Sequence, residues 1–368
     1  GGYTNLSRRT IYTPEGPNAI ADAIRVSASL TSVNLLGNTL DDETVLMLLG
    51  IKKEKPSLLT LCGLERDATA ADFSCERLKS NDAKLLAPEI AVNASLTSID
   101  LGYNSIGIDM TLQLVDSFKE KQIVSIGLAS CCDLGVDGAQ AVAEYISVSA
   151  SLTRIDLRGN KLDDEGAKHI AEGIAVSASL TSIDLSDNWF EFEATKHIAE
   201  GISASASLTS IDLSRNALGE NDAIHIAEGI AVSASLTVID LMANGIGLEG
   251  VKAIAEAILV SASLTSVNLL DNCRRDEAVL ILLGTKKAKP SLLTLCGLER
   301  DATAADFSRK GLDIYDAKLL APEIAVSASL TSINLKSNYI SDEGAKHIAE
   351  AISVSASLTS IDLSWNGL

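Results

Sequence analysis

Four histidines are the side chains whose types and spacing most resemble a metal site. His169, His197 and His225 recur every 28 residues, and His347 stands in a further copy of the same KHIAE phrase. Two imidazoles can share one ion only if both reach it at about 2.1 Å. Because the helices expected to carry them lie about 10 Å apart, we interpret the histidines as repeated surface residues. We therefore predict no metal site and no cofactor.

A column of carboxylates is the second candidate for chemistry. It occupies one position of each repeat: Asn34, Asp72, Asp100, Gly127, Asp156, Asp184, Asp212, Asp240, Asn268, Asp306, Asn334 and Asp362. Paired carboxylates can act as acid and base only when their environments separate their two pKa values. A uniform ladder has no such difference, and the sequence contains no GxSxG, HExxH or Walker A motif. We therefore predict a protein that is not an enzyme, with no catalytic residue.

The same column could instead recruit a partner. Carboxylates about 5 Å apart repel one another and lower the electrostatic potential of a groove, and a basic partner would relieve the repulsion. The alternative is that Asp belongs only to the repeat consensus and is offset by neighbouring Ser and Thr. Both interpretations remain open at this point.

The six cysteines show no CxxC pair and no zinc-ligand spacing. They occupy unlike positions in the repeats: Cys62, Cys75, Cys131, Cys132, Cys273 and Cys296. We predict that they are reduced.

The elements that position these side chains follow from a 28-residue period. The phrase SASLTSIDLSxN recurs almost verbatim, and its central Leu or Phe marks thirteen units. These markers are Leu6, Leu35, Phe73, Leu101, Leu128, Leu157, Leu185, Leu213, Leu241, Leu269, Phe307, Leu335 and Leu363. The chain is therefore expected to be a repeat array.

Each unit combines two periodicities. The core around Ile183 and Leu185 alternates apolar and polar residues, as a strand requires. The segment after the core has apolar residues at i, i+3, i+4 and i+7, for example at 167, 170, 171 and 174, which is typical of an amphipathic helix. Neither element can bury its apolar side alone, so the units must stack.

The predicted fold class is therefore α/β, a right-handed solenoid with a horseshoe shape. About thirteen strands form a concave parallel sheet, and the α-helices form the convex layer, because helices need 8–10 Å of spacing and strands only about 4.8 Å. We predict a single solenoid over residues 1–368. Both ends fall inside a repeat, which suggests a fragment of a longer array and end-to-end self-association through uncapped edges.

Two units, at 41–78 and 275–312, are longer than the others. They share the phrase KPSLLTLCGLERDATAADFS, at 55–74 and 289–308, which indicates duplication of a block. Its apolar LLTLCGL portion could be an extra short strand or a packed loop. The simpler interpretation is a lengthened turn that lets the register resume, and the functional one is a protruding partner site.

This pattern resembles the ribonuclease-inhibitor-like leucine-rich repeats, also found in NOD-like receptors and Ran GTPase-activating proteins. The resemblance implies that the Asn column bonds buried turn backbone: Asn38, Asn104, Asn160, Asn188, Asn216, Asn244, Asn272, Asn338 and Asn366. It is specific for fold and weakly specific for function, because such relatives inhibit, sense or activate different targets.

The net charge of the chain bears on which classes of partner it can bind. The formal net charge is -19 and the sequence pI is about 4.6, which argues against nucleic acid and against anionic membranes. The sequence has no apolar run of about 18 residues and no signal peptide, so we expect a cytoplasmic protein. It begins at Gly1 without a Met, so an upstream segment is also compatible with the sequence.

We therefore expect a non-enzymatic scaffold for protein–protein interaction or a ligand-sensing array. The alternative is an inhibitor or regulator of an enzyme or small GTPase that binds through the acidic concave face. Partner contacts are expected where the repeats differ and along the carboxylate column: Tyr103, Arg154, Asp156, Arg158, Asp184, Asp187, Asp212, Arg215, Asp240 and Met242. Four of these carboxylates, at 156, 184, 212 and 240, should lie side by side, exposed to solvent and without salt bridges.

Overall fold

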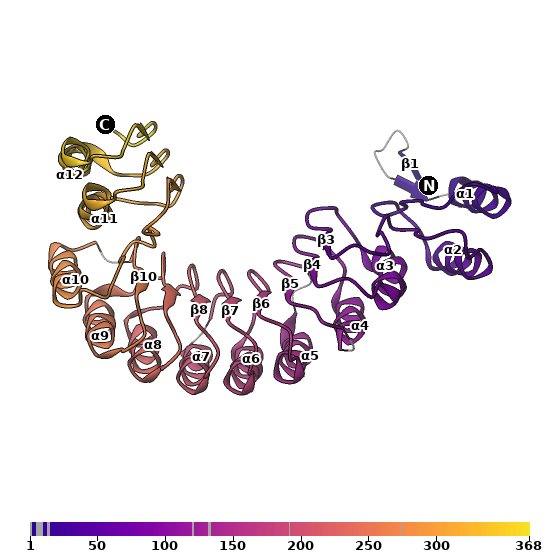
Figure 1. Ribbon diagram of the computed structural model, residues 1–368, viewed down its shortest axis with the longest axis horizontal. Helices are drawn as coiled ribbons and strands as arrows, with labels where there is room; N and C mark the ends of the chain where they lie inside the picture. The colour runs from indigo at the N-terminus through magenta and orange to yellow at the C-terminus, as the bar shows by residue number, and fades with distance from the viewer. Residues whose placement is uncertain are drawn as a thin grey trace. The chain divides into compact units, whose positions relative to one another are not determined.

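The computed structural model describes residues 2–4, 10–12, 15–119, 121–131, 134–190, 192–272 and 274–368. It divides into two compact units, residues 1–160 and 161–368. In both units short parallel strands alternate with helices (Figure 1), which confirms the predicted repeat architecture. No helix within the described residues is both long enough and apolar enough to cross a membrane.

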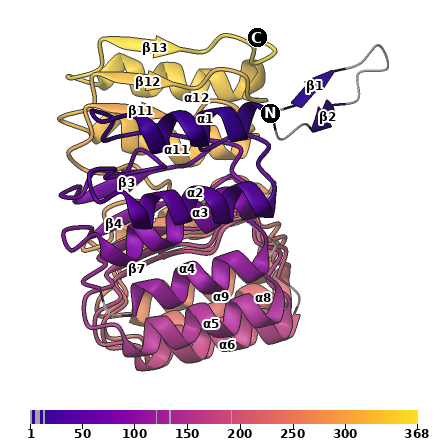
Figure 2. The same ribbon diagram turned by 90° about the vertical axis from the view of Figure 1, so that its right-hand side faces the viewer.

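The first unit begins with two short strands, and four parallel strands follow later in the chain. Strands β1 (Gly2–Thr4) and β2 (Thr10–Tyr12) pair antiparallel, apart from the helices (Figure 2). The predicted strand core at Leu6 lies outside the described residues. The remaining elements are α1 (Glu15–Val26), α2 (Asp42–Glu54), β3 (Ala70–Asp72), α3 (Ser80–Val92), β4 (Ser98–Asp100), α4 (Ile108–Phe118), β5 (Ser125–Gly127), α5 (Gly135–Val148) and β6 (Arg154–Asp156). Strands β3 to β6 pair in sequence order.

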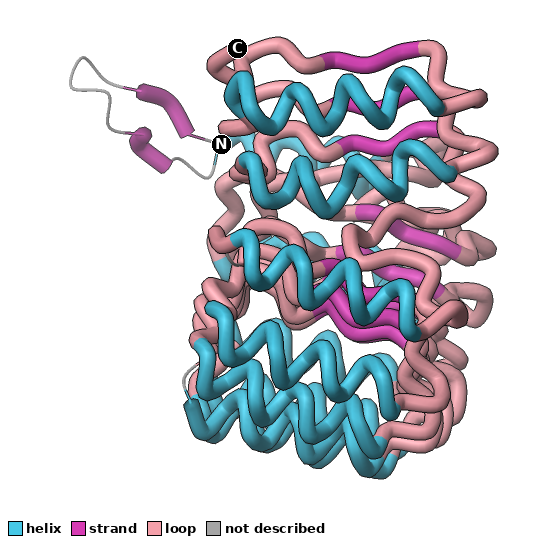
Figure 3. The backbone as a smooth tube through the Cα atoms, turned by 90° about the vertical axis from the view of Figure 1, so that its left-hand side faces the viewer, coloured by secondary structure: helices cyan, strands magenta, loops and turns pink. Residues whose placement is uncertain are grey.

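The second unit repeats the same alternation. Its elements are α6 (Asp164–Val176), β7 (Ser182–Asp184), α7 (Phe192–Ala204), β8 (Ser210–Asp212), α8 (Glu220–Val232), β9 (Val238–Asp240), α9 (Gly247–Val260), β10 (Ser266–Asn268), α10 (Asp276–Ala288), β11 (Ala304–Asp306), α11 (Ile314–Val326), β12 (Ser332–Asn334), α12 (Ser341–Val354) and β13 (Ser360–Asp362). Strands β7 to β10 pair in parallel order, and β11 to β13 do the same. Figure 3 shows the helices and the strands of this unit as separate layers.

One repeat illustrates why the residues form these elements. Asp163 precedes α6, and its carboxylate accepts the Gly166 N–H at 2.9 Å, which satisfies an amide at the helix start. Ile170 and Ile174 on α6 are fully buried, and so is Ile183 of β7. The core therefore lies between the strand layer and the helix layer, as the two periodicities require.

The LLTLCGL segments are extra strand-like segments, so their interpretation as lengthened turns is wrong. Thr60 and Thr294 form parallel bridges with Ser32 and Ser266, and Leu35 donates its N–H to the Leu61 carbonyl at 2.9 Å. Apolar side chains of both copies are buried. The favourable free energy of burying this apolar run offsets the conformational entropy lost when the segment becomes ordered. We call residues 60–62 and 294–296 the extra strand segments.

Close packing between helices predicts opposite effects for two glycine substitutions. In Gly229→Ala the new Cβ would lie 2.7 Å from the Ala199 carbonyl oxygen on α7, so we expect a loss of about 1–2 kcal/mol of stability. In Gly284→Ala the Cβ meets no atom within 4 Å, and the better helix propensity of Ala should stabilise α10 by about 0.5–1 kcal/mol. Urea unfolding followed by circular dichroism measures both. Equal effects of the two variants would contradict this packing argument.

Candidate protein-binding surface

The strand face is the surface formed by the outward side chains of the parallel strands and by the turn after each strand. Four predicted interaction residues lie on the strand face of the first unit: Tyr103, Arg154, Asp156 and Arg158. Six lie on or beneath that of the second unit: Asp184, Asp187, Asp212, Arg215, Asp240 and Met242. Each set is described within its own unit.

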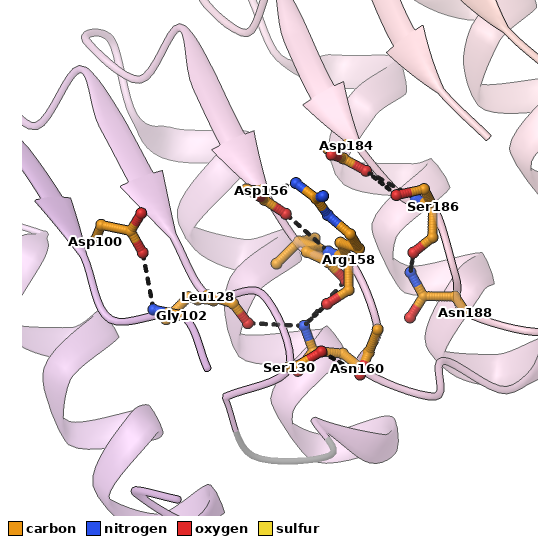
Figure 4. A network of polar contacts seen from close by, with 12 residues as sticks. Asp100, Gly102, Leu128, Ser130, Asp156, Arg158, Asn160, Asp184, Ser186 and Asn188 are labelled. Atoms are coloured by element: carbon orange, nitrogen blue, oxygen red, sulfur yellow. Dashed lines mark hydrogen bonds and ion pairs between the residues drawn. The ribbon is translucent and has the colours of Figure 1, made fainter. Parts of the chain in front are cut away.

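Each carboxylate of the column has a structural bond to the turn that follows it. Asp184 accepts the Ser186 N–H at 2.9 Å, and Asp100 accepts the Gly102 N–H at 2.8 Å (Figure 4). Where the column has Asn instead, Asn334 accepts the Lys336 N–H in the same way at 3.1 Å. The bond therefore needs an oxygen acceptor at this position and does not need a negative charge.

Three carboxylates of the second unit lie in register on neighbouring strands. Asp184 pairs with Asp212, and Asp212 with Asp240, as Cα partners in parallel strands, whose spacing is about 4.8 Å. Burial, and then the charges of Asp240 and Asp184, raise the pKa of Asp212 to about 6. Burial also raises the pKa of Asp240, which accepts a hydrogen bond from the Asn268 amide at 2.9 Å. We call Asp184, Asp212 and Asp240 the carboxylate ladder.

The expectation for Asp156 needs correction. Its carboxylate forms an ion pair with the Arg158 guanidinium at 3.0 Å (Figure 4), and its side chain is 25% exposed. Asp156 also accepts the Arg158 N–H at 3.0 Å. The prediction that this carboxylate is solvent-exposed and without a salt bridge is therefore wrong. The turn places a cation two residues after the aspartate, where it can fold back over the carboxylate.

The carboxylates at 184, 212 and 240 are half-buried rather than solvent-exposed. Their bonds to the following turn draw them toward the backbone, so the predicted full exposure of these three residues is also wrong.

Met242 also differs from the expectation. Its side chain is only 4% exposed, so it packs beneath the strand face instead of presenting itself to a partner. Tyr103, Arg154, Asp187 and Arg215 are exposed. The alternation of inward and outward side chains along a strand does not distinguish buried Met242 from the exposed residues. That alternation ends in the turn, where the backbone of Arg215 has a φ of +59°.

An acidic pocket lies between the start of α6, with the residues just before it, and the turn that follows β7. It has a volume of about 700 Å³, and its lining includes three carboxylates, of Asp163, Asp164 and Glu165, together with Lys161 and Trp189. Trp189 is 70% exposed and does not pack under the turn. An exposed indole with carboxylates beside it can accept a cationic side chain through cation–π and charge interactions.

The side chains of the Asn column bond to the buried backbone of the turns, as expected. Asn216 Nδ2 donates to the carbonyls of Leu185 and Leu213, at 3.0 and 2.9 Å. The Asn188 N–H donates to Asn216 Oδ1 at 2.7 Å, and the Asn216 N–H donates to Asn244 Oδ1 at 2.7 Å. These bonds tie each turn to the next and hold the strand face in place.

Sequence reasoning missed two buried glutamates. Glu89 on α3 and Glu323 on α11 each bind the extra strand segment of their unit. The only signal was the repeated PEIAV phrase after each copy of the duplicated block. Three described cysteines, Cys62, Cys75 and Cys296, are free thiols, while Cys132 and Cys273 lie outside the described residues.

The pKa of Asp212 predicts a pH dependence of stability. The folded-state value of about 6 lies above the ordinary value of 3.8, so between about pH 4 and 6 the folded state holds a proton that the unfolded state has lost. Ionised Asp212 therefore costs stability above pH 6, and the cost disappears as the pH falls toward 4. Asp212→Asn keeps the acceptor and should raise stability at pH 7 by on the order of 2 kcal/mol.

Urea unfolding between pH 4 and 8 measures this effect. The gain of Asp212→Asn over the wild type should shrink as the pH falls. Asp362→Asn is the matched control, because the Ser364 hydroxyl and N–H lower the pKa of that carboxyl, so this variant should show no gain at pH 7. A constant gain for Asp212→Asn at all pH values would contradict the assignment.

A match to a family model agrees with the repeat architecture. A family model described as Leucine Rich repeat matches residues 148–171, 232–255 and 326–349. Among solved structures, the leucine-rich repeat-containing protein LegL7 from Legionella pneumophila is similar with 19% identity and a TM-score of 0.45, over 90% of this chain and 89% of that one. The C-terminal domain of Caenorhabditis elegans tropomodulin has 16% identity and a TM-score of 0.36, over 42% and 92%. Leiomodin-1 actin-binding site 2 has 12% identity and a TM-score of 0.36, over 41% and 87%.

Proposed function

We propose that this leucine-rich-repeat chain is a non-enzymatic protein-binding array that engages a basic partner through the carboxylate ladder. Repeat arrays of this kind present extended surfaces on which partners bind. The full helix in each 28-residue unit supports the ribonuclease-inhibitor-like subtype as part of the proposal. The observation that carries it is the register of Asp184, Asp212 and Asp240 on adjacent strands.

The three negative charges of the carboxylate ladder lower the stability of the folded chain. A costly feature that folding does not need supports a role in binding. Like charges directly opposite each other on neighbouring strands are destabilising, and burial, followed by the charges of Asp240 and Asp184, raises the pKa of Asp212. Asn at the same column position, as at Asn268 and Asn334, makes the same turn bond without the charge. Folding alone therefore does not require Asp at these three positions.

The acidic pocket at Trp189 supports the same partner chemistry. Its carboxylates at the start of α6 have the same sign as the ladder, and its indole suits a Lys or Arg side chain. A basic segment could place one cation there and others along the ladder. Long-range attraction would then speed the first encounter.

The experiment compares the wild type with Asp184→Asn/Asp212→Asn/Asp240→Asn in binding a Lys-rich peptide. The triple variant keeps the turn bonds and removes three charges. We expect its association rate at low salt to fall roughly five- to tenfold, with a smaller change in dissociation. The wild-type rate should fall as salt rises, because screening shortens the Debye length.

A matched control removes the same charge from the helix layer. Glu172→Gln/Glu200→Gln/Glu228→Gln changes carboxylates that lie within 3.8 Å of histidines on α6 to α8. This variant should bind the peptide at nearly the wild-type rate. Equal losses in the two triple variants would mean that net charge alone drives binding, and would overturn the proposed site.

A further inference from the structure

The helix layer lacks one helix at each extra strand segment. In the first unit, the extra strand segment 60–62 is followed by β3 at Ala70, and residues 63–69 form no helix. In the second unit, residues 297–303 likewise contain no helix before β11 at Ala304. In an ordinary repeat a helix follows each strand. No helix follows the extra strand segment between α2 and α3 or the one between α10 and α11.

A pocket lies in each of these places. The first slot, between α2 and α3, has a volume of about 630 Å³ and is lined by Leu49, Lys53, Pro56, Leu58, Arg66 and Pro88, among others. The second slot, between α10 and α11, has a volume of about 360 Å³ and includes Pro290, Leu292 and Arg300, which correspond to Pro56, Leu58 and Arg66. The same block thus builds a pocket twice.

A buried network lies next to each slot. Glu89 accepts the Thr60 hydroxyl and the Leu61 N–H, both at 2.6 Å, and pairs with Lys52 from α2. In the second slot Glu323 has the same partners, at 2.6 Å from the Thr294 hydroxyl and 2.7 Å from the Leu295 N–H, and pairs with Lys286. The extra strand segment beside each slot is therefore held in place by defined bonds.

The helices beside the slots carry exposed apolar side chains. Leu46 on the outward side of α2 is 70% exposed, and Leu280 at the same place on α10 is also 70% exposed. The corresponding position is Lys168 on α6 and Ile224, which is less exposed, on α8. Leu59 and Leu293, each directly before an extra strand segment, are exposed as well. Exposed apolar groups gathered beside a pocket indicate an interaction site.

The first slot carries two exposed cations in a chain of net charge -19. Lys53 and Arg66 are exposed at the first slot, and no carboxylate is among the described residues that line it. At the second slot Arg300 takes the place of Arg66, and Lys287 is exposed next to the lining residue Lys286, while Glu299 and Glu323 also line the slot. Lys52 and Lys286 form ion pairs with the buried glutamates. The exposed cations Lys53 and Arg66 are the ones that can meet a ligand.

We propose that each slot binds apolar side chains of an amphipathic, acidic helix of a partner protein. A helix docks by its apolar face in a groove through side chains at i, i+3, i+4 and i+7. Its apolar anchors would enter between α2 and α3, and its carboxylates would meet Lys53 and Arg66. This surface is separate from the carboxylate ladder and has the opposite charge preference.

The test uses a fluorescent peptide of about 16 residues with Leu at helical spacing and Glu elsewhere. Calorimetry should give two peptides bound per chain. Lys53→Glu/Arg66→Glu should reduce this to one, and so should Lys287→Glu/Arg300→Glu. Combining all four substitutions should weaken the remaining binding at least tenfold. Lys168→Glu/Lys196→Glu, on the outer faces of α6 and α7, makes the same charge change elsewhere and should leave two peptides bound.

Three results would overturn the proposal. The first is equal binding of a scrambled peptide or of one with Lys in place of Glu. The second is unchanged binding by the fourfold variant. The third is a dimer of the chain alone in sedimentation velocity that Lys53→Glu/Arg66→Glu dissolves, which would assign the slots to a second copy. Because the probe here is acidic, failure of this test leaves the result with the Lys-rich peptide unaffected.

Discussion

Glu323→Ala should destabilise the region around the second slot by about 3–5 kcal/mol. Glu323 is 5% exposed and is the acceptor for the Thr294 hydroxyl and the Leu295 N–H. Its removal leaves these two donors unsatisfied and leaves the Lys286 ammonium without its counter-charge. Buried donors without an acceptor cost about 1–3 kcal/mol each, so the loss should exceed that of an ordinary truncation.

The site of the loss is as informative as its size. In the described residues β11 pairs with β12 alone, so Glu323 provides the link between the extra strand segment and α11. Hydrogen exchange measured by mass spectrometry should show lost protection at 290–300 and in α11. Protection in α7 and α8 should remain.

Glu323→Gln separates charge from hydrogen bonding. Its amide oxygen can still accept the Leu295 N–H, so we expect a loss of about 1–2 kcal/mol, smaller than that of the alanine variant. The equivalent change in the first unit, Glu89→Ala, should lower protection at 57–64. If Glu323→Ala leaves exchange at Leu295 unchanged, the glutamate does not hold the segment.

Asn216→Ala should destabilise the second unit by about 2–4 kcal/mol. The substitution removes the donor to the Leu185 and Leu213 carbonyls and the acceptor of the Asn188 N–H, all buried at the turn. Alanine offers neither function, and the fully buried position leaves no room for solvent to replace them.

Urea unfolding and hydrogen exchange of the turns at 185–188 and 213–216 measure this loss. Arg215→Ala is the control, because Arg215 is the exposed neighbour in the same turn; its effect should stay within about 0.5 kcal/mol. Asn216→Asp keeps an acceptor but loses the amide donor, so it should be destabilised as well. A near-neutral Asn216→Ala would show that the chain of Asn bonds is not required for the turns.

The repeat architecture was predictable because its causes are local. Alternation around Ile183 predicts a strand, and the spacing of Ile170 and Ile174 predicts the helix before it. The recurrence of Asn216 and its equivalents predicts their turn bonds through the resemblance to a known repeat family. Every unit faces the same packing problem, so one solution serves along the chain.

The candidate surface was predictable only in part. The strand period places Asp184, Asp212 and Asp240 on one face, and their register follows from the equal length of the repeats. Their burial, the raised pKa of Asp212 and the Arg158 ion pair of Asp156 depend on side chains that meet in three dimensions. Met242 is buried for the same reason, since it stands in a turn where the strand period has already ended.

The sequence alone determined the period, the strand and helix of each unit, and the two places where the period fails. The tertiary structure decided what happens at those places. Residues 60–62 become a strand-like segment because Thr60 and Leu61 find partners in Glu89, 28 or more residues away along the chain. No local pattern encodes such a contact, because its free energy depends on burial and on hydrogen bonds that exist only after the units have stacked.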